Sequence, residues 1–180
     1  SSVVHPSIVT IFNSGEYDGH LWIAMEYIDG IDALKLLRQN PRGLDTATVI
    51  AIVRAVGAAL DRAHATGLLH RDVKPANILL QGAGGPEPRV LLADFGIAVR
   101  VTDARLTHAG TVVGTPGYLP TEAYAPGNPS RTMDLYAAGV TAVRMVLPEV
   151  DLSADPLRPE DVAELELFED SPALRTGDWD

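Results

Sequence analysis

Two short strings of residues hold most of the side chains that could perform chemistry. The first runs from His70 to Asn77 and reads His-Arg-Asp-Val-Lys-Pro-Ala-Asn, and the second is Asp94-Phe95-Gly96, directly after an apolar run. The chain has no cysteine, which excludes a thiol nucleophile, a zinc–thiolate site and disulfide bonds. Any chemistry therefore rests on carboxylate, amide, amine, imidazole and hydroxyl groups.

The order and spacing of these residues resemble the signature of a protein family. The pattern H-R-D-x-K-P-x-N followed by D-F-G fixes nine residue identities, and it is similar to that of the eukaryotic-type serine/threonine protein kinases that bacteria also carry. The resemblance covers about residues 5–147. Its flanking matches are His5-Pro6-Ser7-Ile8-Val9, the hinge-like Ala24-Met25-Glu26-Tyr27-Ile28-Asp29-Gly30, Gly114-Thr115-Pro116-Gly117-Tyr118 with Glu122, and Asp134-Leu135-Tyr136 with Gly139.

The resemblance implies roles in phosphoryl transfer from ATP to a hydroxyl group, a reaction that depends on positioning and on charge neutralisation by Mg²⁺. Asp72 corresponds to the base that accepts or orients the substrate hydroxyl proton, and Lys74 to the lysine that reaches the transferred phosphate. Thr115 corresponds to a threonine that bonds both of them, and a plain turn residue is the alternative. Asn77 and Asp94 correspond to the two Mg²⁺ ligands.

The resemblance also implies an ATP site beside the hinge. Backbone groups of Glu26 and Ile28 would read the adenine, so that their side chains matter little, while Met25 would border the pocket and Leu79 would form its floor. Asp32 would contact the ribose or cap the helix that follows, and both interpretations stay open. The nucleotide-binding set is therefore Met25, Glu26, Ile28, Asp32, Lys74, Asn77, Leu79 and Asp94, with ATP and Mg²⁺ as cofactors.

Two neighbouring residues of the first string have different expected roles. His70 is expected to be a packing residue that stacks with Ile11 and Phe95. Arg71 resembles an arginine that anchors a phosphate on the activation segment, because a phosphothreonine pairs well with a guanidinium group. Thr107 is the first choice for that phosphorylated residue, Thr111 the second, and Thr102 also lies in the segment; each of them is otherwise a simple loop residue.

The elements that must position these residues follow from periodicity and turn residues. Apolar residues at three- and four-residue spacing (Val49, Ile52, Val53, Val56, Leu60 and Ala63) predict a long helix that opens at Asp45 or Thr46 and ends before Gly67. A short helix capped by Asp32 extends to Gln39, and residues 134–147 form a second apolar helix. Four β-rich runs lie at 8–14, 20–26, 77–81 and 89–93, with an Asp-Gly hairpin turn between the first two.

This order predicts an α+β fold. The resemblance implies that it is of the protein-kinase type, with a partial N-lobe (a β-hairpin plus the hinge) and a mainly helical, truncated C-lobe. The expected organisation is a partial kinase domain at 1–147, with a small-lobe remnant and hinge at 1–28 and the large lobe at 29–147. An acidic tail follows at 148–180, with a short helix at 160–168 and with Arg158 as a candidate partner for Glu122.

Large departures from the family pattern accompany the match. No Gly-rich loop, strand lysine or partner glutamate precedes His5 in the sequence. We therefore expect an internal fragment or a degenerate copy of a kinase, inactive in isolation. A pseudokinase-like binding or scaffold module is the alternative function. A small-molecule phosphotransferase is less favoured, because it gives no reason for Lys74 or for the segment 114–122.

Charge and hydropathy narrow the expected partners and location. The net charge of −10 argues against nonspecific nucleic-acid binding, which relies on basic side chains. No apolar run approaches the ~18 residues that a membrane span needs, so we expect no membrane contact from this segment and a cytoplasmic location, although the parent protein could be anchored outside it. The expected partners are ATP and proteins that present serine or threonine hydroxyls.

Overall fold

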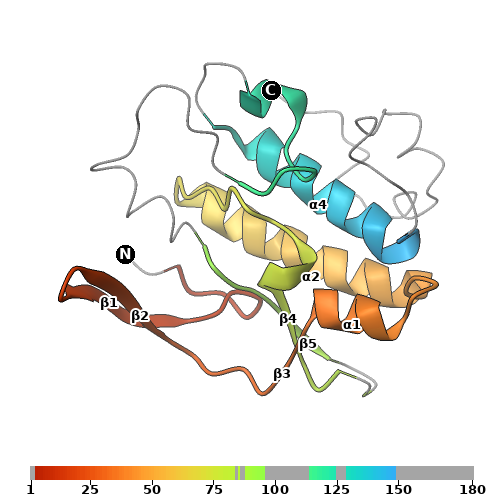
Figure 1. Ribbon diagram of the computed structural model, residues 1–180, viewed down its shortest axis with the longest axis horizontal. Helices are drawn as coiled ribbons and strands as arrows, with labels where there is room; N and C mark the ends of the chain where they lie inside the picture. Colours follow the sequence, from red (N-terminus) through yellow and green to blue (C-terminus); the bar gives the residue numbers. More distant parts are fainter. Residues whose placement is uncertain (1–2, 84, 86–87, 96–113, 125–128, 149–180) are drawn as a thin grey trace.

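The computed structural model describes residues 3–83, 85, 88–95, 114–124 and 129–148. Figure 1 shows two long helices side by side, a small sheet beside them, and a separate β-hairpin near the N-terminus. This arrangement is the α+β architecture that the sequence predicts. Several predictions fall outside the described residues, namely those on Thr102, Thr107, Thr111, Arg158, the helix at 160–168 and almost all of the acidic tail.

Strands β1 (Ile11–Tyr17) and β2 (His20–Met25) form the predicted antiparallel hairpin. Tyr17 pairs with His20, which leaves Asp18 and Gly19 as a two-residue turn. Both turn residues have positive φ angles, 50° and 72°. A type I′ turn requires this conformation at both positions, and Asp-Gly is a favoured sequence for it.

The predicted start of the first strand, at residue 8, is wrong. Ile8 and Val9 are buried against the end of another strand, and they do not extend the hairpin. The Val9 amide donates to the Leu92 carbonyl (3.0 Å), the Leu92 amide donates to the Ser7 carbonyl (2.8 Å), and Ile8 forms a parallel bridge with Leu92. The apolar pair therefore joins the hairpin to the rest of the molecule.

A three-stranded antiparallel sheet supports the two sequence motifs that carry the expected catalytic residues. Its order is β3 (Gly30–Asp32), β4 (Ile78–Gln81) and β5 (Arg89–Leu92). The strands predicted at 77–81 and 89–93 are confirmed to within one residue, but they are not an isolated pair, because β3 adds a third strand. At Gly30 an added Cβ would lie 2.2 Å from the Leu80 carbonyl oxygen, so the close approach of β3 to β4 requires glycine there.

The two helices predicted after the hinge are confirmed. Helix α1 (Ala33–Gln39) begins after Asp32, and α2 (Thr46–Ala65) begins after Asp45, each aspartate accepting a backbone N–H as the N-cap. Helix α2 ends in a Schellman arrangement, in which the Gly67 amide donates to His64 O and the Leu68 amide to Ala63 O, both at 3.0 Å. Gly67 has φ 75°, the left-handed conformation that this ending needs.

Helix α4 (Arg131–Val146) begins three residues before the predicted start at Asp134, with Ser130 at the N-cap position. It packs against α2, whose other neighbour is the sheet, and most of the apolar core forms between these three parts. All the apolar positions predicted for α2 are buried except Val53, which is half-buried. The largest fully buried apolar side chains are Ile52, Leu60, Ile78, Leu80, Leu91, Leu92 and Met145.

Candidate active site

The fold brings residues from three separated segments to one place. The loop after α2 carries Asp72 and Lys74, and it leads into a 3-10 helix (Pro75–Asn77) and then into β4. Asp94 follows β5, which pairs with β4. Thr115 comes from the described segment 114–124, which also holds a 3-10 helix (Thr121–Tyr124). Because α2 packs against the sheet, the loop that joins α2 to β4, and that carries Asp72 and Lys74, is held in place.

Asp72, Lys74 and Thr115 form a closed triangle of hydrogen bonds. The Thr115 hydroxyl donates to Asp72 Oδ1 (2.6 Å), Lys74 Nζ donates to the Thr115 hydroxyl (2.7 Å), and Lys74 Nζ lies 2.7 Å from Asp72 Oδ2. The Asn77 amide group adds donations to the Asp72 carbonyl (2.8 Å) and to Oδ2 (3.2 Å). The side chains of Asp72 and Lys74 keep 31% and 25% of their surface exposed, so both remain accessible to solvent.

The surroundings of Asp72 keep its carboxylate ionised. Partial burial raises the pKa of Asp72, but hydrogen bonds from Lys74, Thr115 and Asn77 and the charge of Lys74 outweigh this, and the net pKa lies below its usual value. An ionised carboxylate has about four acceptor sites, and three side-chain donors occupy three of them. Asp72 is therefore a weak proton acceptor that retains room to orient one more donor, such as an incoming hydroxyl group.

Asn77 and Asp94 present oxygen atoms of the kind that a hard cation prefers. Asn77 is buried, and both of its hydrogen bonds to Asp72 use the amide nitrogen, which leaves Oδ1 for a ligand. Asp94 is exposed and has φ 62°, and the Ala93 amide before it donates to the Asn77 carbonyl (2.8 Å). The donor set therefore fits Mg²⁺, which would be held by Asn77 and Asp94.

His70 is a packing residue, as predicted. Its ring meets that of Phe95 edge-on at 4.6 Å, and its Nε2 donates to the Ala93 carbonyl (2.9 Å). Burial lowers the pKa of His70, so the ring is neutral, and Nδ1 accepts the Asp72 amide (3.2 Å). The expected stack with Ile11 is not formed, because Ile11 lies half-buried in β1 and is not among the residues that pack in the core cluster around Phe95.

Two of the residues expected around adenine, Ile28 and Leu79, lie near each other. Ile28 and Leu79 are half-buried and pack with Val9, Leu91 and Ala93 in a small apolar cluster. Met25 is 39% exposed at the end of β2. The Asp32 carboxylate caps α1 by accepting the Lys35 amide (2.6 Å), so the capping interpretation is confirmed, and its proposed ribose contact stays a prediction.

The side chain of Glu26, for which no contact was predicted, has a partner outside the expected nucleotide site. Its Oε1 accepts a hydrogen bond from Arg89 Nη1 (2.8 Å), and this bond lowers the pKa of Glu26. The Glu26 amide donates to the Thr10 carbonyl (2.8 Å). The Arg89 ion pair therefore ties the hinge to β5.

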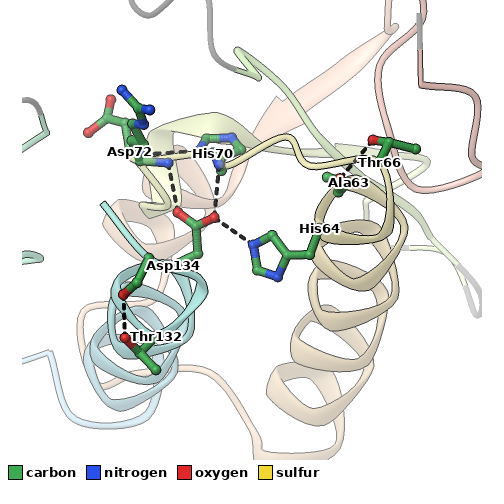
Figure 2. Close-up of polar contacts among 9 residues, drawn as sticks. Ala63, His64, Thr66, His70, Asp72, Thr132 and Asp134 are labelled. Carbon is green, nitrogen blue, oxygen red and sulfur yellow. Dashed lines mark hydrogen bonds and ion pairs between the residues drawn. The ribbon is translucent and has the colours of Figure 1, made fainter. Parts of the chain in front are cut away.

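Two features of the site have no place in the predicted set. Asp134 is 1% exposed and its carboxylate accepts the backbone amides of His70 (2.8 Å) and Arg71 (2.7 Å) (Figure 2). Arg144 lies over the Tyr118 ring at 4.4 Å, a cation–π contact between α4 and the segment 114–124. In the sequence Asp134 is marked only as the one acidic residue of α4. Glu122 is exposed, and its candidate partner Arg158 lies outside the described residues.

Arg71 combines two unusual features. Its φ is 68°, which is rare for a side chain of this size, and its Nε atom is buried without a hydrogen-bond partner among the described residues. A buried, unpartnered guanidinium N–H is suited to an anion. The three threonines expected to carry that anion lie outside the part of the chain that the structure describes.

Comparison with known proteins agrees with this geometry. The family model described as the protein kinase domain matches residues 1–169, and the chain therefore belongs to the protein kinase family. Its relatives include the serine/threonine-protein kinase PknF of Mycobacterium tuberculosis, 44% identical over 148 residues, which are 81% of this chain and 31% of PknF. PknI of the same species is 42% identical over 159 residues, which are 86% of this chain and 25% of PknI.

The fold agrees with a solved member of the family. The crystal structure of the Mycobacterium tuberculosis PknI kinase domain matches with a TM-score of 0.68 and 38% identity, covering 92% of this chain and 60% of that one. The chain thus spans about a third or less of the length of these curated relatives, and about three-fifths of the solved kinase domain. Within the described residues, no helix is both long enough and apolar enough to cross a membrane.

Proposed function

We propose that this chain carries the catalytic segment of a serine/threonine protein kinase, which transfers the terminal phosphoryl group of ATP to serine or threonine hydroxyls of proteins. The observation that carries the proposal is the Asp72–Lys74–Thr115 triangle, with Asn77 bonded to its carboxylate. A scaffold has no chemical need for these four interacting side chains together. The names of the relatives support the same reaction class.

The proposed division of labour follows the contacts. Asp72 orients the acceptor hydroxyl, Lys74 stabilises the transferred phosphate, and Thr115 holds both side chains in place. Asn77 and Asp94 bind Mg²⁺, which neutralises phosphate charge when it is present. The Ile28 and Leu79 cluster receives the adenine, with Met25 at its border, the Glu26 carbonyl and Ile28 backbone as hinge contacts and Asp32 near the ribose. Residues 1–28 act as small-lobe remnant and hinge, 29–147 as large lobe, and 148–180 as an acidic tail, in a cytoplasmic part of the parent protein.

The function is tested in a complete domain in which residues 3–148 replace the equivalent segment of the PknI kinase domain. We expect phosphoryl transfer to a serine/threonine peptide library, and a loss of about two orders of magnitude or more for Asp72→Asn. Asp94→Asn should nearly eliminate transfer, because an amide is a poor replacement for a carboxylate on Mg²⁺. Asp61→Asn, at an exposed position of α2, is the matched control and should leave the rate unchanged.

Thermal melting of each variant separates lost chemistry from lost folding. A folded chimera without transfer activity would contradict the proposed function. Near-normal activity of a folded Asp94→Asn variant would contradict its assignment as a metal ligand. The same chimera also tests the proposed substrate class, because transfer confined to tyrosine peptides would contradict a serine/threonine kinase.

We further propose that a phosphate on Thr107 pairs with Arg71 and activates the kinase. The support is the buried Nε of Arg71, which has no partner among the described residues, and the direct sequence neighbourhood of Arg71 and Asp72. A charge-assisted phosphate–arginine contact adds one to three hydrogen bonds, enough to order a loop. Thr115 is not the regulated residue, because its hydroxyl is engaged with Asp72 and Lys74.

Thr107→Ala should lower the activity of the chimera, and Arg71→Ala in addition should lower it little further, because both changes remove one interaction. Mass spectrometry locates the phosphate. Phosphorylation of Thr111 or Thr102 without Thr107 would contradict the site. Additive effects of the two substitutions would contradict the pairing with Arg71.

A further inference from the structure

Arg144 is a half-buried cation in the last turn of α4, and it lies beside the segment that carries Thr115. Its guanidinium carbon is 4.4 Å from the centre of the Tyr118 ring. Gly117 is the second neighbour of the guanidinium, because a Cβ added to this glycine would come within 3.2 Å of Nη2 of Arg144. The side chain is therefore held against the segment 114–124 by an aromatic ring and by a residue that has no side chain.

The contact with Tyr118 does not use the hydrogen-bonding groups of the guanidinium. A cation is attracted to the face of a ring by the electrons of the ring, whereas the five N–H donors of arginine point outward in the plane of the guanidinium. Among the described residues, Arg144 forms no hydrogen bond and no ion pair with a carboxylate. Its planar fork of donors matches the two oxygens of a carboxylate, so an acidic group from another molecule fits this position.

The helix end alone does not account for this placement. The macrodipole of α4 favours a cation in the last turn, but this attraction acts equally on a side chain that points into solvent. Arg144 instead lies on the segment 114–124 and is half-buried there. Partial burial removes water from the charged group, and a bound carboxylate would offset that loss.

A tight turn links the position of this cation to the proposed site of transfer. Thr115, whose hydroxyl donates to Asp72, is the first residue of the turn, and the Tyr118 amide closes the turn by donating to the Thr115 carbonyl (3.1 Å). Pro116 and Gly117 occupy the middle positions, as a type II turn favours, and Gly117 has the positive φ (81°) that such a turn needs. The ring under the cation is therefore held close to the residue that bonds the Asp72 carboxylate.

A peptide whose hydroxyl group lies at Asp72 can reach Arg144 with a nearby side chain. The first and last Cα atoms of a β-turn are less than about 7 Å apart, and an extended peptide covers about 3.3 Å per residue. A carboxylate within about four residues of the acceptor hydroxyl therefore spans the distance across the turn to the guanidinium.

We propose that Arg144 selects protein substrates that carry aspartate or glutamate within about four residues of the serine or threonine that receives the phosphate. The substrate carboxylate binds the guanidinium that Tyr118 and Gly117 hold beside the site. This inference rests on the proposed kinase function, because it names the class of peptide that the site accepts. The net charge of the chain is −10, so overall charge does not attract such peptides, and the preference depends on the local contact with Arg144.

The first test uses the complete domain in which residues 3–148 replace the equivalent segment of the PknI kinase domain. The substrates are serine peptides that carry Glu, Gln or Lys at one of the four positions before or after the serine. We expect kcat/KM to be about fivefold higher for Glu than for Gln at one or more positions, the upper range for a partly exposed ion pair. This preference should disappear in Arg144→Gln, and in Arg144→Glu it should pass to the Lys peptides. Arg131→Gln, at an exposed position in the first turn of α4, is the matched control and should keep the wild-type preference.

The second test needs no catalysis, which separates this inference from the proposed function. The full 180-residue chain is titrated with the Glu and Gln peptides, and NMR follows the Nε–H signal of Arg144. We expect the Glu peptide to shift this signal and to saturate it at about fivefold lower concentration than the Gln peptide. If Arg144→Gln does not fold, this comparison on the wild-type chain decides.

Three results would overturn the proposal. Equal kcat/KM for the Glu and Gln peptides at every position would show that Arg144 only stacks on Tyr118. A preference for Glu that survives in folded Arg144→Gln would assign the selection to another cation, such as Lys74. An Arg144 signal that responds equally to both peptides would show that the guanidinium binds no substrate carboxylate. If the chimera transfers no phosphate but the signal responds selectively to the Glu peptide, the kinase function fails and the acidic-peptide site stands.

Discussion

At the scale of single residues, the carboxylate of Asp72 contributes both to the stability of the fold and to the proposed function. Its oxygens accept bonds from Thr115, Lys74 and Asn77, and all three donors favour the ionised form. The same contacts that would aim an acceptor hydroxyl therefore hold the loop, the 3-10 helix Pro75–Asn77 and the segment 114–124 together. A substitution at Asp72 should be visible in the stability of the chain as well as in its chemistry.

The first prediction concerns the pH dependence of stability. Because the pKa of Asp72 is lower in the folded chain than its usual 3.8, the ionised form stabilises the fold at neutral pH. This contribution is lost as the pH falls from about 3.8 towards the lower, folded value. The decrease in melting temperature between about pH 6 and pH 3 should therefore be smaller for Asp72→Asn than for the wild type.

Other carboxylates also contribute to acid sensitivity, so the comparison needs a control. Glu26, whose pKa the hydrogen bond from Arg89 lowers, is present in both chains and cancels in the difference. Asp61→Asn, on the exposed surface of α2, removes one acid without touching the site and should melt like the wild type at both pH values. Equal acid sensitivity of Asp72→Asn and the wild type would contradict the role given to the triangle.

Single residues also show which contacts could be predicted from the sequence and which could not. Asp72, Lys74 and Thr115 could be expected to meet, because their motif matches those of kinases whose loops bring such residues together. The structural role of Asp134 could not be predicted in the same way, because its partners are the backbone amides of His70 and Arg71, and such contacts have no sequence signature. The ion pair between Glu26 and Arg89 could not be predicted for a related reason, because it depends on the placement of the hinge beside β5.

At the scale of elements, α2 could be predicted completely and β3 could not be predicted at all. Local signals predict both ends of α2, namely the Asp45 cap, the apolar period and the glycine after the last residue. Strand β3 has only three residues, Gly30–Asp32, and it exists because β4 passes beside it. Short strands depend on partners distant in sequence, whereas helix signals are local.

The ending of α2 supplies a matched pair of glycine substitutions. Gly67 has φ 75° and Gly57 lies in the helix interior, and at neither position would an added Cβ meet an atom within 4 Å. Gly67→Ala should destabilise the chain by about 1 kcal/mol, because L side chains disfavour the left-handed conformation. Gly57→Ala should stabilise it by about 0.5–1 kcal/mol through helix propensity. Urea denaturation measures both, and shifts in the same direction would contradict the assigned helix end.

At the scale of the whole molecule, the hairpin and the large lobe are held together by few contacts. Ile8 and Val9 join the hairpin to β5, and the Glu26–Arg89 ion pair adds a second, partly exposed link. An isolated two-stranded hairpin is marginally stable in water. The hairpin also exposes Phe12 (69%), Tyr17 (81%) and Leu21 (55%), so β1 and β2 bury little of their own apolar surface among the described residues.

The last prediction follows from this difference between the hairpin and the large lobe. The 180-residue chain contains the loop proposed to orient a hydroxyl and the residues proposed to bind Mg²⁺, but its sequence before the hinge includes neither a Gly-rich loop nor a strand lysine. Positioning of the phosphates contributes a large part of the rate in phosphoryl transfer. We therefore expect the chain alone to show no ATP turnover or autophosphorylation above that of its Asp72→Asn variant, measured with radiolabelled ATP and Mg²⁺. The PknI chimera is the positive control, because it differs in having a complete small lobe around the same site. Turnover by the chain alone that Asp72→Asn abolishes would show that the hinge and catalytic loop suffice to position ATP.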